Sequence, residues 1–233
     1  MVDLHSHVLF EIDDGAESIE QSIEILRIAY DAGIRKMIAT PHFTLGEDVE
    51  KMTDRRDRRL RALKDAMEHE GIEIELKAGF EVYITDELFN EEELHRLCLG
   101  DSDVLLAEFK YHGLKREVFI GYIDEFIKKG VKVLVAHPER YSYLINDPML
   151  LDALLSRGVM LQVNGISLFE DSEEGDFARF LVERNLADVI GSDIHHPASR
   201  RLKAMKKLGE HPGRNVIRAL NDTPDKIFEG RGV

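Results

Sequence analysis

The sequence predicts an α/β fold in which a parallel sheet closes into a barrel. Short apolar or β-branched runs alternate along the chain with amphipathic stretches of helical periodicity. The runs are apolar at nearly every position, which is typical of parallel strands that are covered by helices. No Gly-rich phosphate loop or dinucleotide fingerprint follows any run, and this absence favours a barrel over an open nucleotide-binding sheet.

The elements follow one another in a regular order. The seven predicted strands are residues 2–8, 35–40, 72–81, 104–109, 131–137, 159–163 and 187–192. The predicted helices are residues 19–31, 50–70, 115–129, 148–156 and 176–184. Glycines lie between helix and strand where a left-handed C-cap is expected, namely Gly33, Gly71, Gly130 and Gly158. No Pro-, Ser- or Gly-rich linker divides the chain, so we expect a single domain over residues 1–233.

The composition excludes several classes of protein. The 233 residues include 31 Lys and Arg, 45 Asp and Glu and 43% hydrophobic residues, with a formal net charge of −14. This supports a large core and a charged surface and argues against general nucleic-acid binding. No apolar run could cross a bilayer, and no secretory signal is visible. Cys98 is the only cysteine, which excludes a disulfide framework and a Cys-rich zinc module. We therefore expect a cytoplasmic protein without membrane insertion.

Ionisable side chains end or follow almost every predicted strand. In a β/α barrel these strand ends converge on one face, which carries the active site. Imidazole and carboxylate ligands together suit Mn, Fe or Zn. Nine such groups are too many for one ion, so we expect two or three ions. The nine candidate ligands are His5, His7, Asp14, His42, Glu81, Glu108, His137, Asp193 and His195.

Taken singly, these residues have simpler explanations. A His-x-His pair such as His5 and His7 often lies at a surface or in a core. Asp14 and Asp193 could each cap the next helix, and Glu108 could be a surface residue at a strand end. Their joint placement at successive strand ends favours metal binding, because several buried carboxylates need compensating cations. The remaining histidines are predicted to be solvated, and these are His69, His95, His112, His196 and His211.

Motifs at the candidate ligands resemble those of the PHP (polymerase and histidinol phosphatase) superfamily over nearly the whole chain. They are DLHSH at 3–7, TPH at 40–42, GFEVY at 79–83, AHPER at 136–140 and GSDIH at 191–195. The segments LLAEF, VLVAHPERY and LQVNGISL are most similar to the bacterial manganese-dependent tyrosine phosphatases of capsule and exopolysaccharide synthesis, the CpsB/YwqE type. This resemblance implies a distorted (β/α)7 barrel and hydrolysis of phosphotyrosine. The implied substrate is the tyrosine-rich tail of a bacterial tyrosine kinase.

The same resemblance implies three bound divalent ions, with Mn²⁺ expected and Fe or Zn as alternatives. The implied ligands are His5, His7, Glu81 and Asp193 for the first ion, Glu81, Glu108 and His137 for the second, and Asp14, His42 and His195 for the third. It also implies that Arg140 and Arg200 bind the phosphate, with Arg201 as an alternative to Arg200. A guanidinium fork suits this role because it contacts phosphate oxygens through two N–H groups. A surface ion pair is the simpler role for either arginine.

The expected reaction is in-line attack on phosphorus by a metal-activated hydroxide. A cysteine-dependent tyrosine phosphatase is excluded, because that class needs Arg six residues after the catalytic Cys, and position 104 after Cys98 is Val104. One rival function is a histidinol-phosphate phosphatase, or another small phosphomonoesterase of the same superfamily, which would share the metal site. A second rival is a non-catalytic metal-binding or polymerase-associated domain.

Overall fold

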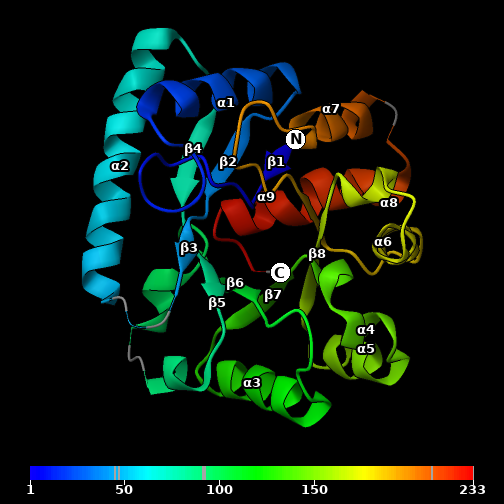
Figure 1. Ribbon diagram of the computed structural model, residues 1–233. Coiled ribbons are helices and arrows are strands. Elements are labelled where there is room, and N and C mark those ends of the chain that lie inside the picture. Colours follow the sequence, from blue (N-terminus) through cyan, green and yellow to red (C-terminus); the bar gives the residue numbers. More distant parts are fainter. Residues whose placement is uncertain (45, 47, 91–92, 211, 233) are drawn as a thin grey trace.

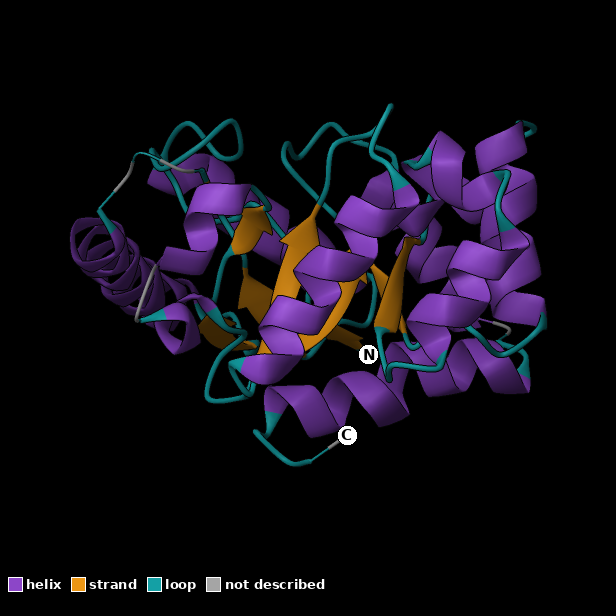
Figure 2. Cartoon of the chain, turned by 90° about the horizontal axis from the view of Figure 1, so that it is seen from below, coloured by secondary structure: helices purple, strands orange, loops and turns teal. Residues whose placement is uncertain are grey.

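Helices surround a central set of strands in the computed structural model (Figures 1 and 2), which describes residues 1–44, 46, 48–90, 93–210 and 212–232. The strands are β1 (Val2–Asp3), β2 (Lys36–Ala39), β3 (His42–Phe43), β4 (Glu75–Ala78), β5 (Glu81–Tyr83), β6 (Val104–Glu108), β7 (Lys132–Ala136), β8 (Met160–Asn164) and β9 (Val189–Gly191). The α-helices are α1 (Ile19–Asp31), α2 (Val49–Glu70), α3 (Arg116–Lys128), α4 (Ser142–Ile145), α5 (Pro148–Leu155), α6 (Glu173–Glu183), α7 (Arg201–Glu210), α8 (Arg214–Ile217) and α9 (Thr223–Phe228).

The strands pair in parallel and follow one another around a ring. They form two sheets with the orders β1-β2-β4 and β3-β5-β6-β7-β8-β9. The chain runs directly from one sheet to the other, from β2 to β3 and from β4 to β5. On the other side of the ring, a bridge between Ser6 and Ile194 pairs the segments that follow β1 and β9. This arrangement confirms the predicted α/β fold. The barrel is distorted because its strands form two separate sheets.

Most of the predicted strands are shorter in the structure, and the third is divided. The first is reduced to β1 and the Ser6 bridge. The second ends at Ala39, and a break at Pro41, which has no N–H for the ladder, separates it from β3, which lies beyond its predicted end. The third breaks at Gly79, where a Cβ would lie 2.9 Å from the backbone of Leu99. After these breaks β3 and β5 begin with His42 and Glu81, which face each other in register. The breaks therefore bring two candidate ligands together.

Alternation along β6 shows how the barrel directs side chains inward. Val104 and Leu106 pack in a buried cluster with residues of α9, whereas Leu105 and Ala107 pack with residues of α3. Because successive side chains of a strand point to opposite faces, Glu108 lies on the inner face with Val104 and Leu106. It is also the last residue of its strand. The apolar interior of the barrel therefore ends at the Glu108 carboxylate, at the carboxyl end of β6.

The predicted helices are present within a few residues of their expected bounds. Ser18 caps α1 by accepting a hydrogen bond from the Gln21 N–H, and Asp48 caps α2 by accepting one from Lys51. Gly71 ends α2 in the left-handed conformation, with φ of 63°. The predicted helices do not include α4, nor α7, α8 and α9, which follow the last strand. No helix within the described ranges combines the length and the apolar character that a membrane span needs.

Candidate metal centre

A cavity of about 720 Å³ opens at the carboxyl ends of the strands. Seven of the nine candidate ligands line it, and His5 and His7 lie buried below them. All nine fall into groups whose donor atoms lie within 4.8 Å of one another. The groups are His5, His7 and Glu81; His5, His137 and Asp193; His42, Glu81 and Glu108; and His7, Asp14, His42 and His195.

The deepest part of the centre joins the two histidines that follow β1 with two carboxylates. The Nε2 atoms of His5 and His7 are 3.3 Å apart. Both face Glu81 Oε2, at 3.1 Å from His5 and 3.2 Å from His7. The same two nitrogens each lie 3.5 Å from Asp193 Oδ1. Two imidazole nitrogens and two carboxylates therefore converge on one buried point, which is a donor set suited to a divalent ion.

Glu81 extends the centre toward the ends of β3, β6 and β7. Its Oε1 atom lies 2.8 Å from His137 Nε2, and its Oε2 atom lies 3.2 Å from His42 Nδ1. Glu108 is close to both histidines, with Oε1 3.9 Å from His137 Nε2 and Oε2 4.0 Å from His42 Nδ1. Since Glu81 contacts four imidazoles from three separate segments of the chain, it occupies the position expected of a bridging ligand.

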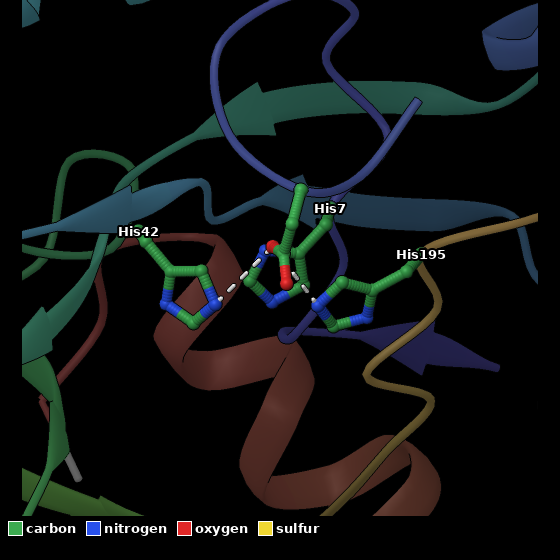
Figure 3. A group of neighbouring side chains, drawn as sticks. His7, His42 and His195 are labelled. Carbon is green, nitrogen blue, oxygen red and sulfur yellow. Dashed lines mark ion pairs between the residues drawn. The ribbon is translucent and has the colours of Figure 1, made fainter. Parts of the chain in front are cut away.

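The third group lies nearer to solvent (Figure 3). His42 and His195 lie on either side of His7, and their rings come from separate segments of the chain. The Nε2 atoms of His42 and His195 are each 3.5 Å from Asp14 Oδ1. His195 stacks on His7 with ring centroids 3.9 Å apart. The Asp14 side chain is 71% exposed, so this group is open to a ligand from solvent.

Unusual backbone conformations place several of these side chains. His137 and Asp193 follow β7 and β9 with φ of 34° and 52°, in the left-handed region that residues other than glycine seldom adopt. The loop that carries Asp14 also approaches His7 closely, because a Cβ on Gly15 would lie 2.2 Å from the His7 carbonyl oxygen. Such strained positions concentrate at functional sites, and here they turn the chain toward the cavity.

The two deepest histidines are held by two further side chains of this protein that were not predicted as part of the site. Asp13 Oδ2 accepts a hydrogen bond from His7 Nδ1 at 2.7 Å and another from the His42 backbone N–H. Burial opposes ionisation of Asp13, but the hydrogen bond and charge of His7 and the backbone hydrogen bonds from His42 and Gly15 together outweigh it and lower the pKa of the carboxyl to about 2. Gln162 Oε1 lies 2.8 Å from His5 Nδ1. These contacts leave Nε2 of both rings free for a metal ion.

The buried carboxylates of the centre favour positive charge beside them. Burial opposes charge on His5 and His7, but the nearby carboxylates outweigh it and raise the pKa of both imidazoles. Burial also opposes ionisation of Glu81 and Asp193, yet the neighbouring histidines hold the pKa of both carboxyls well below the usual range. Divalent cations bound by neutral imidazoles would supply the same charge in place of protons. The donor set therefore fits metal ions.

Arg140 and Arg201 border the cavity beside the ligands. Both contact Asp193 Oδ2, with Nη2 of Arg140 at 3.3 Å and Nη1 of Arg201 at 2.6 Å. Asp193 thus turns Oδ1 to the histidines and Oδ2 to the arginines. Arg200 is exposed and is absent from the described lining of the cavity. The position of the two side chains therefore favours Arg201, the alternative to Arg200, because α7 begins in a phase that directs Arg201 to the cavity.

The simpler explanations of the carboxylates do not hold. The side chain that caps α1 belongs to Ser18 and not to Asp14, and Asp193 lies eight residues before α7 with its side chain in the centre. Glu108 is 8% exposed and is therefore not a surface residue. Four of the histidines predicted to be solvated are exposed, and His211 lies outside the described residues. His196 is one of the four, but it borders the cavity.

A parallel α/β barrel with histidine and carboxylate groups converging at its strand ends defines a metal-dependent hydrolase of the barrel class. The family model for capsular polysaccharide synthesis, CpsB/CapC, matches residues 1–225. The chain belongs to this family, as its motifs predict.

Individual relatives agree with this membership. Tyrosine-protein phosphatase CpsB of Streptococcus pneumoniae is 29% identical over 208 residues, which cover 86% of this chain and 85% of that protein. Tyrosine-protein phosphatase YwqE of Bacillus subtilis (strain 168) is 32% identical over 219 residues, which cover 89% and 82%. A solved structure from the work on YwqE and CpsB, described as metal-dependent tyrosine phosphatases, has a TM-score of 0.83 and 27% identity. It covers 100% of this chain and 96% of that chain.

Proposed function

We propose that this protein is a metal-dependent protein-tyrosine phosphatase. The observation that carries the proposal is the convergence of nine candidate histidine and carboxylate ligands at the cavity that Arg140 and Arg201 border. Metal ligands alone would suit many hydrolases. Two guanidinium groups beside them select a substrate with several negatively charged oxygens, such as a phosphomonoester.

The proposed centre holds three divalent ions, with Mn²⁺ as the first candidate and Fe or Zn as alternatives. The contacts of Glu81 support its role as the bridge between the first ion, with His5, His7 and Asp193, and the second, with Glu108 and His137. Asp14, His42 and His195 are the proposed ligands of the third ion. When bound, such ions supply a water nucleophile activated at neutral pH and neutralise the charge of the phosphoryl oxygens.

The chain's own residues bind and orient the phosphate. Three divalent ions with four carboxylates leave a local charge of about +2, which attracts a phosphate dianion despite the net charge of −14. Arg140 and Arg201 are anchored by Asp193 through one nitrogen each. Arg140 also lies beside the Tyr111 hydroxyl. The N–H groups that these contacts leave free can bind the phosphoryl oxygens, so the two arginines fix the orientation of the phosphoryl group over the centre.

Tyrosine suits this site as the leaving group. A phenol has a pKa of about 10, so its oxygen departs with less protonation than an alkoxide requires. We assign no general acid. The alternative, a phosphatase acting on histidinol phosphate or another alkyl phosphate, must expel the poorer leaving group from the same centre.

The proposed protein substrate is the tyrosine-rich, phosphorylated tail of a bacterial tyrosine kinase that regulates capsule or exopolysaccharide synthesis. Membership in a family described by capsular polysaccharide synthesis supports this choice. A flexible tail suits a cavity that is open to solvent through its Asp14 side. We also propose that residues 1–233 form one phosphatase domain and that it acts in the cytoplasm.

Substrate comparison tests the proposed activity. Protein loaded with Mn²⁺ is expected to hydrolyse a phosphotyrosine peptide with a kcat/KM at least about 100-fold above that for histidinol phosphate, because the phenol is the better leaving group. A phosphoserine peptide of the same sequence controls for peptide binding. Higher kcat/KM for either alkyl phosphate than for phosphotyrosine would contradict the proposal and favour a small-molecule phosphatase.

A further inference from the structure

A tyrosine lines the cavity, and neither metal binding nor phosphate binding assigns it a role. Tyr111 follows β6, three residues after Glu108, and it lines the cavity. Its side chain is 37% exposed, although most aromatic rings of this chain are buried. A single exposed tyrosine is ordinary at a protein surface, so its surroundings decide whether it has a role.

The Tyr111 ring is held in place by a hydrogen bond of its hydroxyl and by contact with a neighbouring aromatic ring. Its hydroxyl donates a hydrogen bond of 2.5 Å to Glu108 Oε1, and the Arg140 guanidinium lies beside the same hydroxyl. The ring stacks on Tyr141 with centroids 5.9 Å apart and an interplanar angle of 28°. His137 lies 5.8 Å away on centroids. Because Tyr111 also lines the cavity and is 37% exposed, part of its surface stays open to a substrate.

Tyr141, on which the Tyr111 ring stacks, is itself held in place. Tyr141 is fully buried, and its hydroxyl accepts a hydrogen bond of 3.0 Å from the Phe109 backbone N–H. This bond ties the segment that carries Tyr111 to the turn that carries Arg140. Tyr143 stacks against Tyr141 in turn, with centroids 5.5 Å apart and an interplanar angle of 9°. Three tyrosines thus form one stack, and Tyr111 is the member that borders the cavity.

We infer that Tyr111 is a specificity residue, whose ring packs against the aryl group of the substrate while the phosphoryl group lies between Arg140 and the metal centre. This inference rests on the proposed function and adds the residue that recognises the aryl ring. Offset or tilted packing of two aromatic rings is favourable, and little conformational entropy is lost because the Tyr111 ring is already fixed. An alkyl phosphate would make the same phosphoryl contacts without the ring contact.

Two phosphonates that are not hydrolysed separate ring recognition from phosphoryl recognition. Phenylphosphonate and methylphosphonate share the charged group and differ in the ring. Calorimetric titration of the Mn²⁺-loaded protein gives a Kd for each, and their ratio reports the contribution of the ring. In the wild type we expect phenylphosphonate to bind on the order of tenfold more tightly. Tyr111→Leu is expected to bring the ratio close to one with little change for methylphosphonate.

Two variants control this result. Tyr111→Phe keeps the ring and removes the hydroxyl, so the ratio should stay within about twofold of the wild type. Tyr143→Leu removes a ring from the same stack at a position outside the described lining of the cavity, and it should also keep the ratio. Equal binding of both phosphonates by the wild type, or an unchanged ratio in Tyr111→Leu, would overturn the inference alone. A wild type that binds neither phosphonate would overturn the proposed phosphatase function as well.

Discussion

Replacing Glu81 with glutamine is expected to abolish most of the activity, with a loss of at least about 1000-fold in kcat/KM. The substitution preserves shape but removes the charge that faces His5, His7 and His137 within 3.2 Å. A neutral amide is a poor ligand for a divalent ion, and it would leave two ions without their shared carboxylate. Metal analysis of the purified variant should therefore show fewer ions per chain than the wild type.

Glu139→Gln is the matched control for this prediction. Glu139 is also fully buried, but its Oε1 atom accepts hydrogen bonds from the Asn164 backbone and the Ser167 hydroxyl. A glutamine oxygen accepts the same bonds. This variant should keep its metal content and lose less than about tenfold in kcat/KM. Wild-type activity in Glu81→Gln would show that the assignment of Glu81 as a bridging ligand is wrong.

The second large effect is expected at the arginines. Arg140→Ala and Arg201→Ala should each lower kcat/KM by about 30- to 1000-fold, since a charge-assisted contact with the phosphoryl group is worth about 2–4 kcal/mol in the transition state. Metal content should not change, because a guanidinium is not a ligand here. Arg140→Lys should recover part of the loss, since it restores the charge without the fork.

The neighbouring arginine provides the control. Arg200 is exposed, whereas Arg201 contacts Asp193 at the cavity. Arg200→Ala should therefore stay within about threefold of the wild type, and inorganic phosphate should inhibit it normally. If Arg200→Ala lost activity and Arg201→Ala did not, the phosphate site would be misassigned. Unchanged kcat/KM in Arg140→Ala would mean that the metal centre alone holds the phosphate.

Most of the fold could be predicted from the sequence, because local signals agree with it. Apolar runs mark the strands, and glycine at helix ends, such as Gly71, marks the caps. The break after the second strand has a local signal in Pro41, whereas the break in the third strand depends on the close approach of Gly79 to Leu99, a contact between segments distant in the sequence. Of the helices after the last strand, α8 and α9 span only four and six residues, which is too short for a helical period to stand out. Ile227 and Phe228 of α9 pack against residues of the strands.

The candidate ligands could be predicted because strand ends of a parallel barrel converge whatever their sequence separation. Residues that orient the ligands could not be predicted in this way. Asp13 reaches His7 only because the loop after β1 folds back. Gln162 sits in an apolar strand, and only the pairing of strands shows that it faces His5. The choice of Arg201 over Arg200 depends on the phase of a helix that the sequence analysis did not predict.

We propose that phosphotyrosine hydrolysis by this protein depends on a centre with several metal ions. The most direct test of this proposal is a titration of chelator-treated protein with Mn²⁺, in which bound metal and the rate of phosphotyrosine-peptide hydrolysis are measured on the same samples. We expect no activity without metal and a rate that saturates only above one bound ion per chain, approaching three. Full activity at zero or one bound ion per chain would contradict the proposal.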